Sequence, residues 1–315
     1  MKRRMKRILK LSLLLLCFIV LSSCNKVVYE NYPIYVFDTV VSLTFYQNGY
    51  EKHVNIIKNK LNSISKETND FQTNSSHNSI YDLNEKRELE VSDDLINIIN
   101  YSNRLMEETE GYFNPYMGRL NHKWKDAIKN NKILNEDEIL LELDIIKSTS
   151  VEINSNTIKI IGEGNIDLGG IVKGYALEWT KNYLDENNIT KYLLDFGSSS
   201  IYLGDYEQYV QLSKPYEAGY IERFKTLNMG IASSSGKHQN AMIDGVRYHH
   251  LINPFTGYPS NIYDAISVIG NIDNGILDAY STAIFSMDEN KAKEFIKNKN
   301  IELVTYKNGN TKHYK

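Results

Sequence analysis

Two oxygen-bearing side chains near the C-terminus are spaced to act on one cation. Asp278 and Thr282 stand four residues apart in a segment with a helical pattern, so their oxygens lie on the same face of the expected helix. A carboxylate together with a hydroxyl or a carbonyl suits a hard cation such as Mg²⁺, which usually keeps waters and ligand phosphates in its shell. The alternative is that Asp278 is an N-cap or a first-turn acid that stabilises the helix dipole.

A turn with paired glycines in the middle of the chain has the features of an anion site. Asp167, Gly169 and Gly170 precede an amphipathic helical pattern that carries Lys173 in its first turn. A helix N-terminus offers unpaired N–H groups and partial positive charge, and glycines let a ligand approach the backbone closely. Such a turn could hold a diphosphate; an ordinary capped helix with a solvated lysine is the alternative.

Two adjacent histidines precede a rigid loop. His249 and His250 are followed by Asn253-Pro254 and by the segment Gly257–Pro259, whose residue types force a rigid loop after a short strand. Adjacent residues of an extended strand point to opposite faces, so only one of the two imidazoles can face a site. Histidine is well suited to proton transfer near neutral pH, and a structural histidine is the alternative for either residue taken alone.

Two look-alikes of nucleotide-binding motifs fail in their details. The segment 230–237 ends in Gly236 and Lys237 like a P-loop, but its spacing is wrong by one residue and His238 stands where a Ser or Thr would bind Mg²⁺. The segment 162–167 begins like a dinucleotide fingerprint and lacks the third glycine. Neither segment predicts a nucleotide site of the familiar kind.

The N-terminus has the pattern of an export signal. Basic residues precede the apolar run 11–21, which is too short for a comfortable membrane span. The run ends in Leu21-Ser22-Ser23-Cys24, which resembles the lipobox of bacterial lipoproteins, whose signal is cut before a cysteine that then receives a diacylglyceryl group. We expect residues 1–23 to be a signal peptide, Cys24 to be lipidated and residues 24–31 to form a tether; an uncleaved anchor with a chance cysteine is the alternative.

Composition excludes several classes of protein. The 315 residues are 42% hydrophobic and 24% charged, which rules out a collagen-like, low-complexity or mainly disordered chain. Without residues 1–23 the chain has 30 basic and 39 acidic residues and a net charge of −9, so nothing indicates a nucleic-acid binder. Because Cys17 lies in the expected signal, the exported part has no second thiol beside Cys24, which excludes an intramolecular disulfide, thiol catalysis and a cysteine-ligated metal.

Helix and strand patterns alternate irregularly along residues 32–315. We expect a helix at 53–61, another from Asp93 to about Glu110 with Ser92 as its N-cap and Gly111 at its end, and further helices after Gly170, Gly275 and Asp288. Strand patterns occupy 36–46, 150–153, 157–161, 191–196, 208–212, 265–269 and 301–306. The last of them runs into Lys307-Asn308-Gly309-Asn310, which is a hairpin turn signal. Because most strand links are short and no linker interrupts the chain, the sequence predicts a single mixed α+β domain rather than a doubly wound parallel sheet.

Taken together, these segments resemble the ApbE-type flavin transferase family. The resemblance covers essentially all of residues 32–315, with matching segments in the same order. The most specific match is Asp167–Tyr175, which is similar to the family's Asp-Leu-Gly-x-x-x-Lys-Gly-Tyr signature. The other matching segments are Phe37–Thr39, Gly111–Leu120, Ile231–Gly236, His250–Pro259 and Asp278–Thr282. An ApbE-like fold is therefore expected.

The resemblance implies an exported enzyme that splits FAD at its diphosphate with Mg²⁺, moves FMN onto a Thr or Ser hydroxyl of a partner protein and releases AMP. It makes His250 the group that acts at the reacting phosphate. The implied metal ligands are Gly170 through its carbonyl, Asp278, Ser281 and Thr282. The residues implied to bind FAD are Phe37, Tyr112, Phe113, Asn114, Asp167, Lys173, Ser235, Gly236 and Leu251.

Four positions depart from the family pattern. Asp38 stands where glycine is usual, Asn114 and Asn253 stand where aspartate is usual, and Phe196–Ser200 takes the place of a Gly-Gly turn. The two lost carboxylates could lower the affinity for metal or change the balance between FMN transfer and FAD hydrolysis.

Three functions remain open. The first is an Mg²⁺-dependent FAD:protein FMN transferase that acts on exported flavoproteins while its lipid holds it at the extracytoplasmic face of the cell membrane. The second is an FAD pyrophosphatase with the same metal site and no protein acceptor. The third is a non-catalytic flavin-binding lipoprotein, which would need neither a base at His250 nor a metal site at Asp278.

Overall fold

The computed structural model describes residues 29–72 and 78–315. The expected signal peptide, Cys24 and most of the expected tether lie outside these ranges. The first strand begins at Glu30, so the folded part starts two residues earlier than the expected boundary at residue 32. Within the described residues, none of the helices has the length and apolar character needed to cross a bilayer.

One large sheet carries the fold. Its eight strands follow the order β1-β2-β6-β7-β10-β13-β14-β15, and each neighbouring pair is antiparallel. The strands are β1 (Glu30–Val36), β2 (Thr39–Phe45), β6 (Tyr192–Phe196), β7 (Ser200–Leu203), β10 (Met229–Ser235), β13 (Ala265–Gly270), β14 (Ile301–Lys307) and β15 (Asn310–Tyr314). Together with the helices this is the mixed α+β architecture that the sequence predicts.

Three small sheets complete the strands. They are β3-β5-β4, made of Glu88–Glu90, Thr157–Ile161 and Ser150–Asn154; β8-β9, made of Gln208–Ser213 and Tyr220–Thr226; and β11-β12, made of Asn240–Ile243 and Val246–His249. The β8-β9 sheet covers part of one face of the large sheet, where Val210 and Leu212 pack in a cluster with Ile231 and Ile269.

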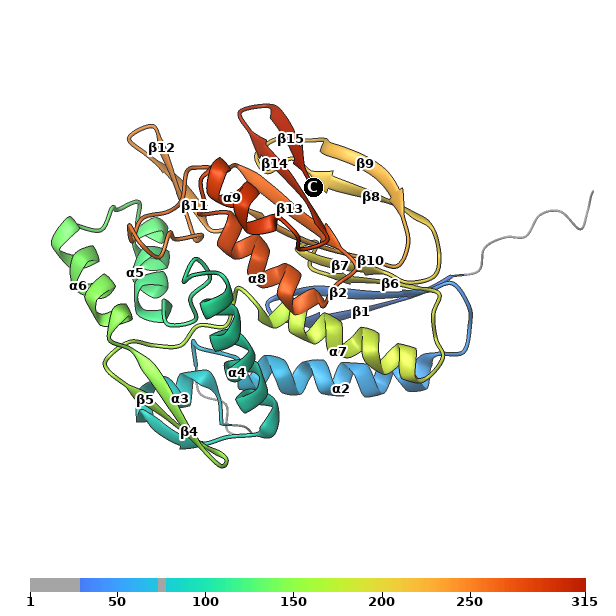
Figure 1. Cartoon of the computed structure of the whole chain (residues 1–315). Coiled ribbons are helices and arrows are strands. Elements are labelled where there is room, and N and C mark those ends of the chain that lie inside the picture. The colour runs from blue at the N-terminus through green and yellow to red at the C-terminus, as the bar shows by residue number, and fades with distance from the viewer. Residues whose placement is uncertain (1–28, 73–77) are drawn as a thin grey trace, which may run out of the picture.

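Helices cover the other face of the large sheet. Figure 1 shows α2, α7 and α8 running along it, with α5 and α6 at one end of the molecule. The helices are α2 (Glu51–Glu67), α3 (Ile80–Lys86), α4 (Asp93–Glu108), α5 (Gly118–Lys129), α6 (Glu136–Lys147), α7 (Val172–Glu186), α8 (Asn274–Ile284) and α9 (Glu289–Ile296).

Small side chains on β10 bring α8 close to the sheet. Gly230, Ala232 and Ser234 alternate along the strand and so share the face that meets the helices. A methyl group added at Gly230 would lie 2.6 Å from Cδ1 of Leu277, and the Ser234 hydroxyl bonds to a hydroxyl of α8. The P-loop look-alike at 230–237 is therefore mostly an extended strand, which explains why it is not a phosphate loop.

Long connections between neighbouring strands carry most of the candidate residues. The segment 46–191 joins β2 to β6, the segment 236–264 joins β10 to β13, and the segment 271–300 joins β13 to β14. Of the predicted site residues, only Phe37 and Ser235 lie outside these three connections. The sheet is thus a frame from which three insertions converge.

The expected elements were found with one clear error. The stretch 36–46 is not a single strand, because Phe37 and Asp38 both have φ of 54° and form a two-residue turn between β1 and β2. The helix α4 is confirmed, with the Ser92 hydroxyl accepting the Leu95 N–H at 3.1 Å. The expected hairpin after β14 is confirmed by its pairing with β15. The short strand expected before the histidine loop is β12. Elements that the sequence analysis missed are α3, α5, α6, β1, β3, β7, β9, β10 and β11.

The contact between α7 and α8 depends on the missing side chain of Gly174. We predict that Gly174→Ala lowers the free energy of unfolding by about 1–3 kcal/mol, the usual cost of overpacking, because its methyl group would lie 2.6 Å from Cβ of Asp278 and would also meet the Asn274 carbonyl oxygen. Elsewhere in a helix this change normally stabilises. Urea unfolding of the variant measures the effect.

The matched control for this measurement is Asn182→Ala, at an exposed position of the same helix. It should leave the unfolding free energy within about 0.5 kcal/mol of the wild-type value. A Gly174→Ala protein as stable as this control would contradict the close packing of α7 on α8.

Candidate active site

The start of α7 and the middle of α8 touch at two points. The Gly174 N–H donates to Oδ2 of Asp278 at 2.9 Å across 104 residues of sequence. The Thr282 hydroxyl donates to the Gly170 carbonyl oxygen at 3.4 Å. The glycine turn and the Asp278–Thr282 pair, which the sequence presents as two separate features, therefore form one place.

Asp278 lies inside α8 and not at its start. The N-cap is Asp273, whose carboxylate accepts the N–H groups of the first turn, so the interpretation of Asp278 as a capping acid is wrong. The Asp278 side chain is buried. Burial raises its pKa, and the positive charge of Lys173 and the N–H of Gly174 oppose that rise. Burial makes an unpaired negative charge costly, so this carboxyl group favours binding a cation or a proton.

The oxygens around Asp278 are of the types that a hard cation prefers. A carboxylate, the Thr282 hydroxyl and the Gly170 carbonyl fit Mg²⁺ in chemical kind. The buried Ser200 side chain on β7 lies close enough to Asp278 for its hydroxyl to help hold the pKa of that carboxyl group down. In the described ranges, no three His, Cys, Asp or Glu side chains are grouped to hold a metal, so a cation here would rest on one carboxylate and neutral oxygens.

The hydroxyl of Ser281, a predicted metal ligand, already takes part in hydrogen bonds within the protein. Its buried hydroxyl lies 2.9 Å from the Ser234 hydroxyl and donates to the Asp278 carbonyl oxygen at 3.0 Å. The bond to Ser234 ties α8 to β10. A serine hydroxyl has one O–H donor and two lone pairs, so Ser281 keeps one lone pair for a cation while it makes both bonds.

His250 presents one free nitrogen. Its Nδ1 lies 3.0 Å from the carbonyl oxygen of His238, and a carbonyl can only accept, so we assign the ring proton to Nδ1 and an open lone pair to Nε2. The pKa of His250 is lowered to about 4, mainly by burial and in part by the charge of Lys173. The imidazole is therefore neutral at physiological pH.

His249 faces the protein core instead. Its side chain is 1% exposed, its ring lies edge-to-face against Phe285 with centroids 5.6 Å apart, and its Nδ1 accepts the N–H of Leu251 at 3.2 Å. Leu251 in turn accepts the N–H of Ser260 through its carbonyl at 2.9 Å. The two adjacent histidines therefore have different surroundings, as expected, and the role of His249 is structural.

Asp167 joins the glycine turn to α5. Its Oδ1 accepts the Gly169 N–H at 2.7 Å and its Oδ2 accepts the side-chain amide of Asn121 at 2.8 Å. The charge of Asp167 opposes the lowering of the His250 pKa, to which Lys173 contributes. Asp167 and Lys173 are therefore both within electrostatic range of His250.

An aromatic segment reaches the same place from the end of α4. A methyl group added at Gly170 would lie 3.3 Å from Cε2 of Phe113 and 3.2 Å from the Thr282 hydroxyl. The Tyr112 ring meets Phe255 edge-to-face with centroids 4.7 Å apart, and Phe255 is 56% exposed. The sequence analysis missed Phe255, because it stands at a variable position of the motif that runs from His250 to Pro259.

Asn114 and Asn253 form turns. The Asn114 side-chain oxygen accepts the Tyr116 N–H at 2.9 Å, and that of Asn253 accepts the N–H groups of Phe255 and Thr256 at 2.9 and 3.2 Å. An aspartate oxygen would make the same bonds. The exchange of aspartate for asparagine at these positions therefore keeps the local backbone.

Trp124 of α5 holds the histidine loop. Its Nε1–H donates to the Gly257 carbonyl oxygen at 2.7 Å, and its ring stacks on Tyr248 with centroids 5.6 Å apart. Gly257 has φ of +73°, and a side chain there would run into Ile139 of α6. The loop that carries His250 is thus held in place by α5 and α6. In the sequence Trp124 is only a large apolar residue in an amphipathic pattern, which does not reveal this role.

The other predicted cofactor residues lie at strand ends. Phe37 occupies the β1-β2 turn, where its N–H donates to the Ser65 hydroxyl of α2 at 3.3 Å. Ser235 ends β10, and Gly236 follows it with its backbone against the hydroxyl of Tyr216. Among the described residues, these three make no hydrogen bond to the α7–α8 contact, and their part in FAD binding stays a prediction.

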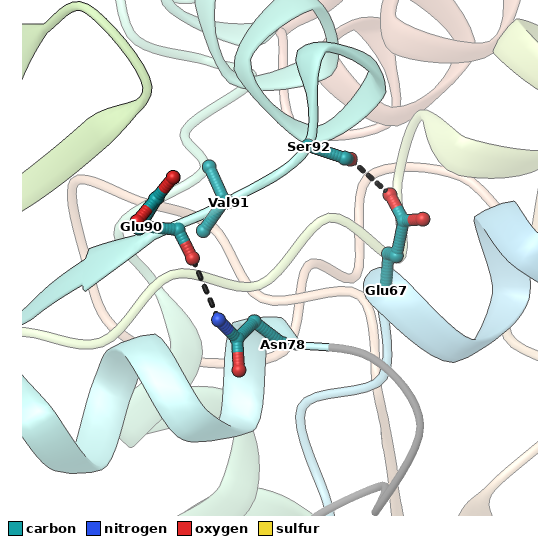
Figure 2. A pocket seen from close by; sticks show the side chains of 5 residues that line it. All are labelled: Glu67, Asn78, Glu90, Val91 and Ser92. Carbon is teal, nitrogen blue, oxygen red and sulfur yellow. Dashed lines mark hydrogen bonds between the residues drawn. The ribbon is translucent and has the colours of Figure 1, made fainter.

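A surface pocket of about 300 Å³ lies away from these residues. Figure 2 shows it between the end of α2 and the start of α4, with the Ser92 hydroxyl donating to Glu67 and the Asn78 amide donating to the Glu90 carbonyl oxygen. It contains none of the predicted site residues, so it is not part of the candidate active site.

We predict that His249 and His250 of the ligand-free protein both stay neutral until the pH approaches about 4, because burial lowers both pKa values from 6.5. The unfolded chain binds these two protons from about pH 6.5 downward, so the free energy of unfolding should fall as the pH drops from there toward 4. Long-range ¹⁵N NMR of the imidazoles measures the titrations.

His122 is the internal control for this titration. It hydrogen-bonds to Asp70 at 2.7 Å, which raises its pKa above 6.5, so its contribution to stability is present below pH 6.5 and is lost as the pH rises through the raised pKa. A His250 signal that titrates together with His122 would contradict the burial argument.

The chain is similar in sequence to curated FAD:protein FMN transferases. The chain is 24% identical over 249 residues to the FAD:protein FMN transferase of Klebsiella pneumoniae (strain 342), covering 76% of this chain and 78% of that protein. It is 24% identical to the protein of the same name from Haemophilus influenzae, covering 68% of this chain and 66% of that protein.

Solved structures share the fold. The ApbE protein of Thermotoga maritima superposes with a TM-score of 0.80 at 22% identity, over 91% of this chain and 97% of that one. Flavin transferase ApbE from Vibrio cholerae superposes with a TM-score of 0.74 at 19% identity, over 91% and 96%. The ApbE family profile matches residues 37–305. The chain therefore belongs to the ApbE family.

Proposed function

We propose that this protein is an Mg²⁺-dependent FAD:protein FMN transferase that attaches FMN to a Thr or Ser hydroxyl of exported flavoproteins and releases AMP. The observation that carries the proposal is the contact of Asp278 and Thr282 with the Gly170–Gly174 turn. This contact puts a candidate cation site against a candidate diphosphate site, with Lys173 and His250 within electrostatic range.

The proposed reaction is a phosphoryl transfer with the acceptor hydroxyl as nucleophile. The hydroxyl oxygen bonds to the phosphorus on the flavin side of FAD, and the bond from that phosphorus to the bridging oxygen breaks. The bridging oxygen leaves with AMP, and the hydroxyl proton goes to Nε2 of His250. In the hydrolytic alternative a water molecule takes the place of the acceptor hydroxyl and free FMN is the product.

His250 meets the two requirements of a base in this step. Its Nδ1–H is held by the His238 carbonyl, which orients Nε2 as the acceptor, and its pKa of about 4 keeps Nε2 unprotonated before FAD binds. A pKa this low makes a weak base. The negative charges of a bound diphosphate would raise the pKa toward the working pH, which improves proton transfer when the substrate is in place.

Lys173 and the glycine turn bind the diphosphate in this proposal. The lysine makes no ion pair within the described part of the chain and lies in the first turn of α7, where the helix dipole also favours an anion. A Mg²⁺ ion held by Asp278, Thr282 and the Gly170 carbonyl would supply further neutralisation of diphosphate charge. The chain itself orients the substrate and accepts the proton.

We further propose that the protein works as a lipoprotein at the extracytoplasmic face of the cell membrane. The support is the sequence pattern that ends in Cys24. Two acyl chains are enough for stable anchoring, whereas one gives marginal binding. An enzyme anchored there meets flavoproteins that have themselves been exported.

We predict that Asp278→Ala and His250→Ala each lower FMN transfer at least a hundredfold, which is the usual order of effect for a group that acts in the transition state. The protein without residues 1–23 is incubated with FAD, Mg²⁺ and an acceptor domain that contains a target Thr. Fluorescent flavin on the acceptor measures transfer, and free FMN with AMP measures hydrolysis. Unchanged FAD with the wild-type protein would indicate a flavin binder and overturn both enzymatic functions.

Asp288→Asn and His313→Ala are the controls for this assay. Asp288 caps α9 and His313 lies on the exposed edge strand β15, so both variants should keep wild-type transfer. Full activity in folded Asp278→Ala would remove the proposed metal ligand, and full activity in folded His250→Ala would remove the proposed base.

We predict that cells fed an alkyne-labelled fatty acid attach the label to the wild-type protein and that Cys24→Ser abolishes this labelling, because Cys24 is the thiol that receives the lipid. Cys17→Ser should label like the wild type, since that cysteine is removed with the signal. Labelling of Cys24→Ser, or its absence in the wild type, would favour the uncleaved anchor.

A further inference from the structure

A second pocket, of about 450 Å³, lies between two surface hairpins close to His250. Its walls come from the β8-β9 turn, which supplies Tyr216 and Glu217, and from the segment leading into and through the β11-β12 hairpin, which supplies Lys237, Asn240 and Arg247. None of these five residues belongs to the predicted active site.

The pocket is lined by two cationic side chains, Arg247 and Lys237. Arg247 stacks on the Tyr216 ring, with Cζ 3.9 Å from the centroid, and its Nη1 donates to Asn240 at 2.6 Å. A guanidinium has five N–H donors, so most of them stay available. Lys237 is exposed. In the described residues neither Lys237 nor Arg247 takes part in an ion pair.

Two of the acidic groups near the pocket form ion pairs with lysines. Glu217 pairs with Lys214 at 2.7 Å, and Asp264 pairs with Lys307 at 3.0 Å. The exported part of the chain carries a net charge of −9. The pocket is therefore a local positive site on an acidic protein, which attracts an anion that the rest of the surface repels.

The pocket and the proposed base share a wall. The backbone runs from Gly236 through Lys237 to His238, whose carbonyl oxygen orients His250. Gly236 itself lies against the Tyr216 hydroxyl and the His249 ring, so that a side chain at this position would strike both. An acceptor segment whose hydroxyl reaches His250 would thus have neighbouring residues beside Arg247.

Apolar surface on the same hairpin favours a protein as the occupant. Met242 of β11 is 54% exposed and is paired with Arg247 across the hairpin, so the two side chains share one face. An exposed apolar side chain beside a cationic pocket suits a polypeptide, whereas a small anion would need only the charges.

We propose that the Arg247 pocket binds an acidic side chain of the acceptor protein near its target Thr or Ser, and so selects the acceptor. This inference rests on the proposed function, because it names what the second substrate of that reaction must carry. A planar guanidinium that is stacked and fixed on one side is suited to receive a carboxylate through two parallel N–H donors.

The test compares enzyme variants on two acceptor domains. One domain carries an aspartate next to the target Thr, and the other differs only in having asparagine there. We expect Arg247→Glu to raise the KM for the acidic domain at least tenfold while the Kd for FAD stays within twofold of the wild-type value. Arg247→Lys should have a smaller effect, because it keeps the charge and loses the fork.

Arg223→Glu is the matched control. Arg223 stacks on Tyr209 with its Cζ 4.2 Å from the ring centroid, in the same manner as Arg247 on Tyr216, but on β9 and outside the pocket. The control should keep the wild-type KM. On the asparagine domain, wild type and Arg247→Glu should have equal KM values, because the charge pair is then absent.

Three results would overturn the assignment. Equal effects of Arg247→Glu and Arg223→Glu on KM would show a general charge effect. An equal rise of KM on both acceptor domains would show that Arg247 does not contact the acidic group. Weaker binding of FAD by Arg247→Glu would show that the pocket binds the nucleotide. Wild-type protein that transfers no FMN to either domain would overturn the proposed function itself and this inference with it, which distinguishes the two failures.

Discussion

The close approach of α7 to α8 at Gly174 is the constraint on which the rest of the site depends. Because Gly174 has no side chain, its N–H reaches the Asp278 carboxylate, and this hydrogen bond brings Thr282 within reach of the Gly170 carbonyl four residues earlier. Small side chains also allow a close approach between α8 and the sheet, because the small residues of β10 let the helix lie directly on the strand. A cation site and a diphosphate site are thereby combined through packing rather than through a cluster of acidic ligands.

Lys173, which forms no ion pair with the residues that the structure describes, sets the balance of charge in this site. Burial raises the pKa of Asp278 and lowers that of His250; Lys173 opposes the first shift and adds to the second, so its charge favours the ionised form of the carboxyl group and the neutral form of the imidazole. Both states are what the proposed transfer needs before the substrate arrives. An anionic substrate that binds Lys173 would weaken its effect on both groups together, which couples substrate binding to the readiness of the base.

Local signals in the sequence predicted much of the fold and part of the site. The α4 cap at Ser92, the β14-β15 turn and the glycine turn before α7 follow from short-range preferences that the tertiary structure leaves unchanged. The turn at Phe37 was missed because an aromatic residue rarely adopts positive φ. The serine-rich β10 was missed because its small side chains reflect the helix packed on it and not an intrinsic strand preference.

Contacts between residues far apart in the sequence had no such local signal. These contacts explain what the departure from the family pattern at Asn253 does. Nothing near Trp124 in sequence reveals that its indole holds the Gly257 carbonyl across 133 residues, yet that bond fixes the loop in which Asn253 stands. Within that loop the Asn253 oxygen holds two backbone N–H groups, and its amide nitrogen also donates to the Ser286 carbonyl at 3.4 Å. An aspartate could not make the last bond, because an ionised carboxylate only accepts. The asparagine therefore ties the histidine loop to the end of α8, so the exchange of residue adds a link between the proposed base and the helix of the proposed cation site.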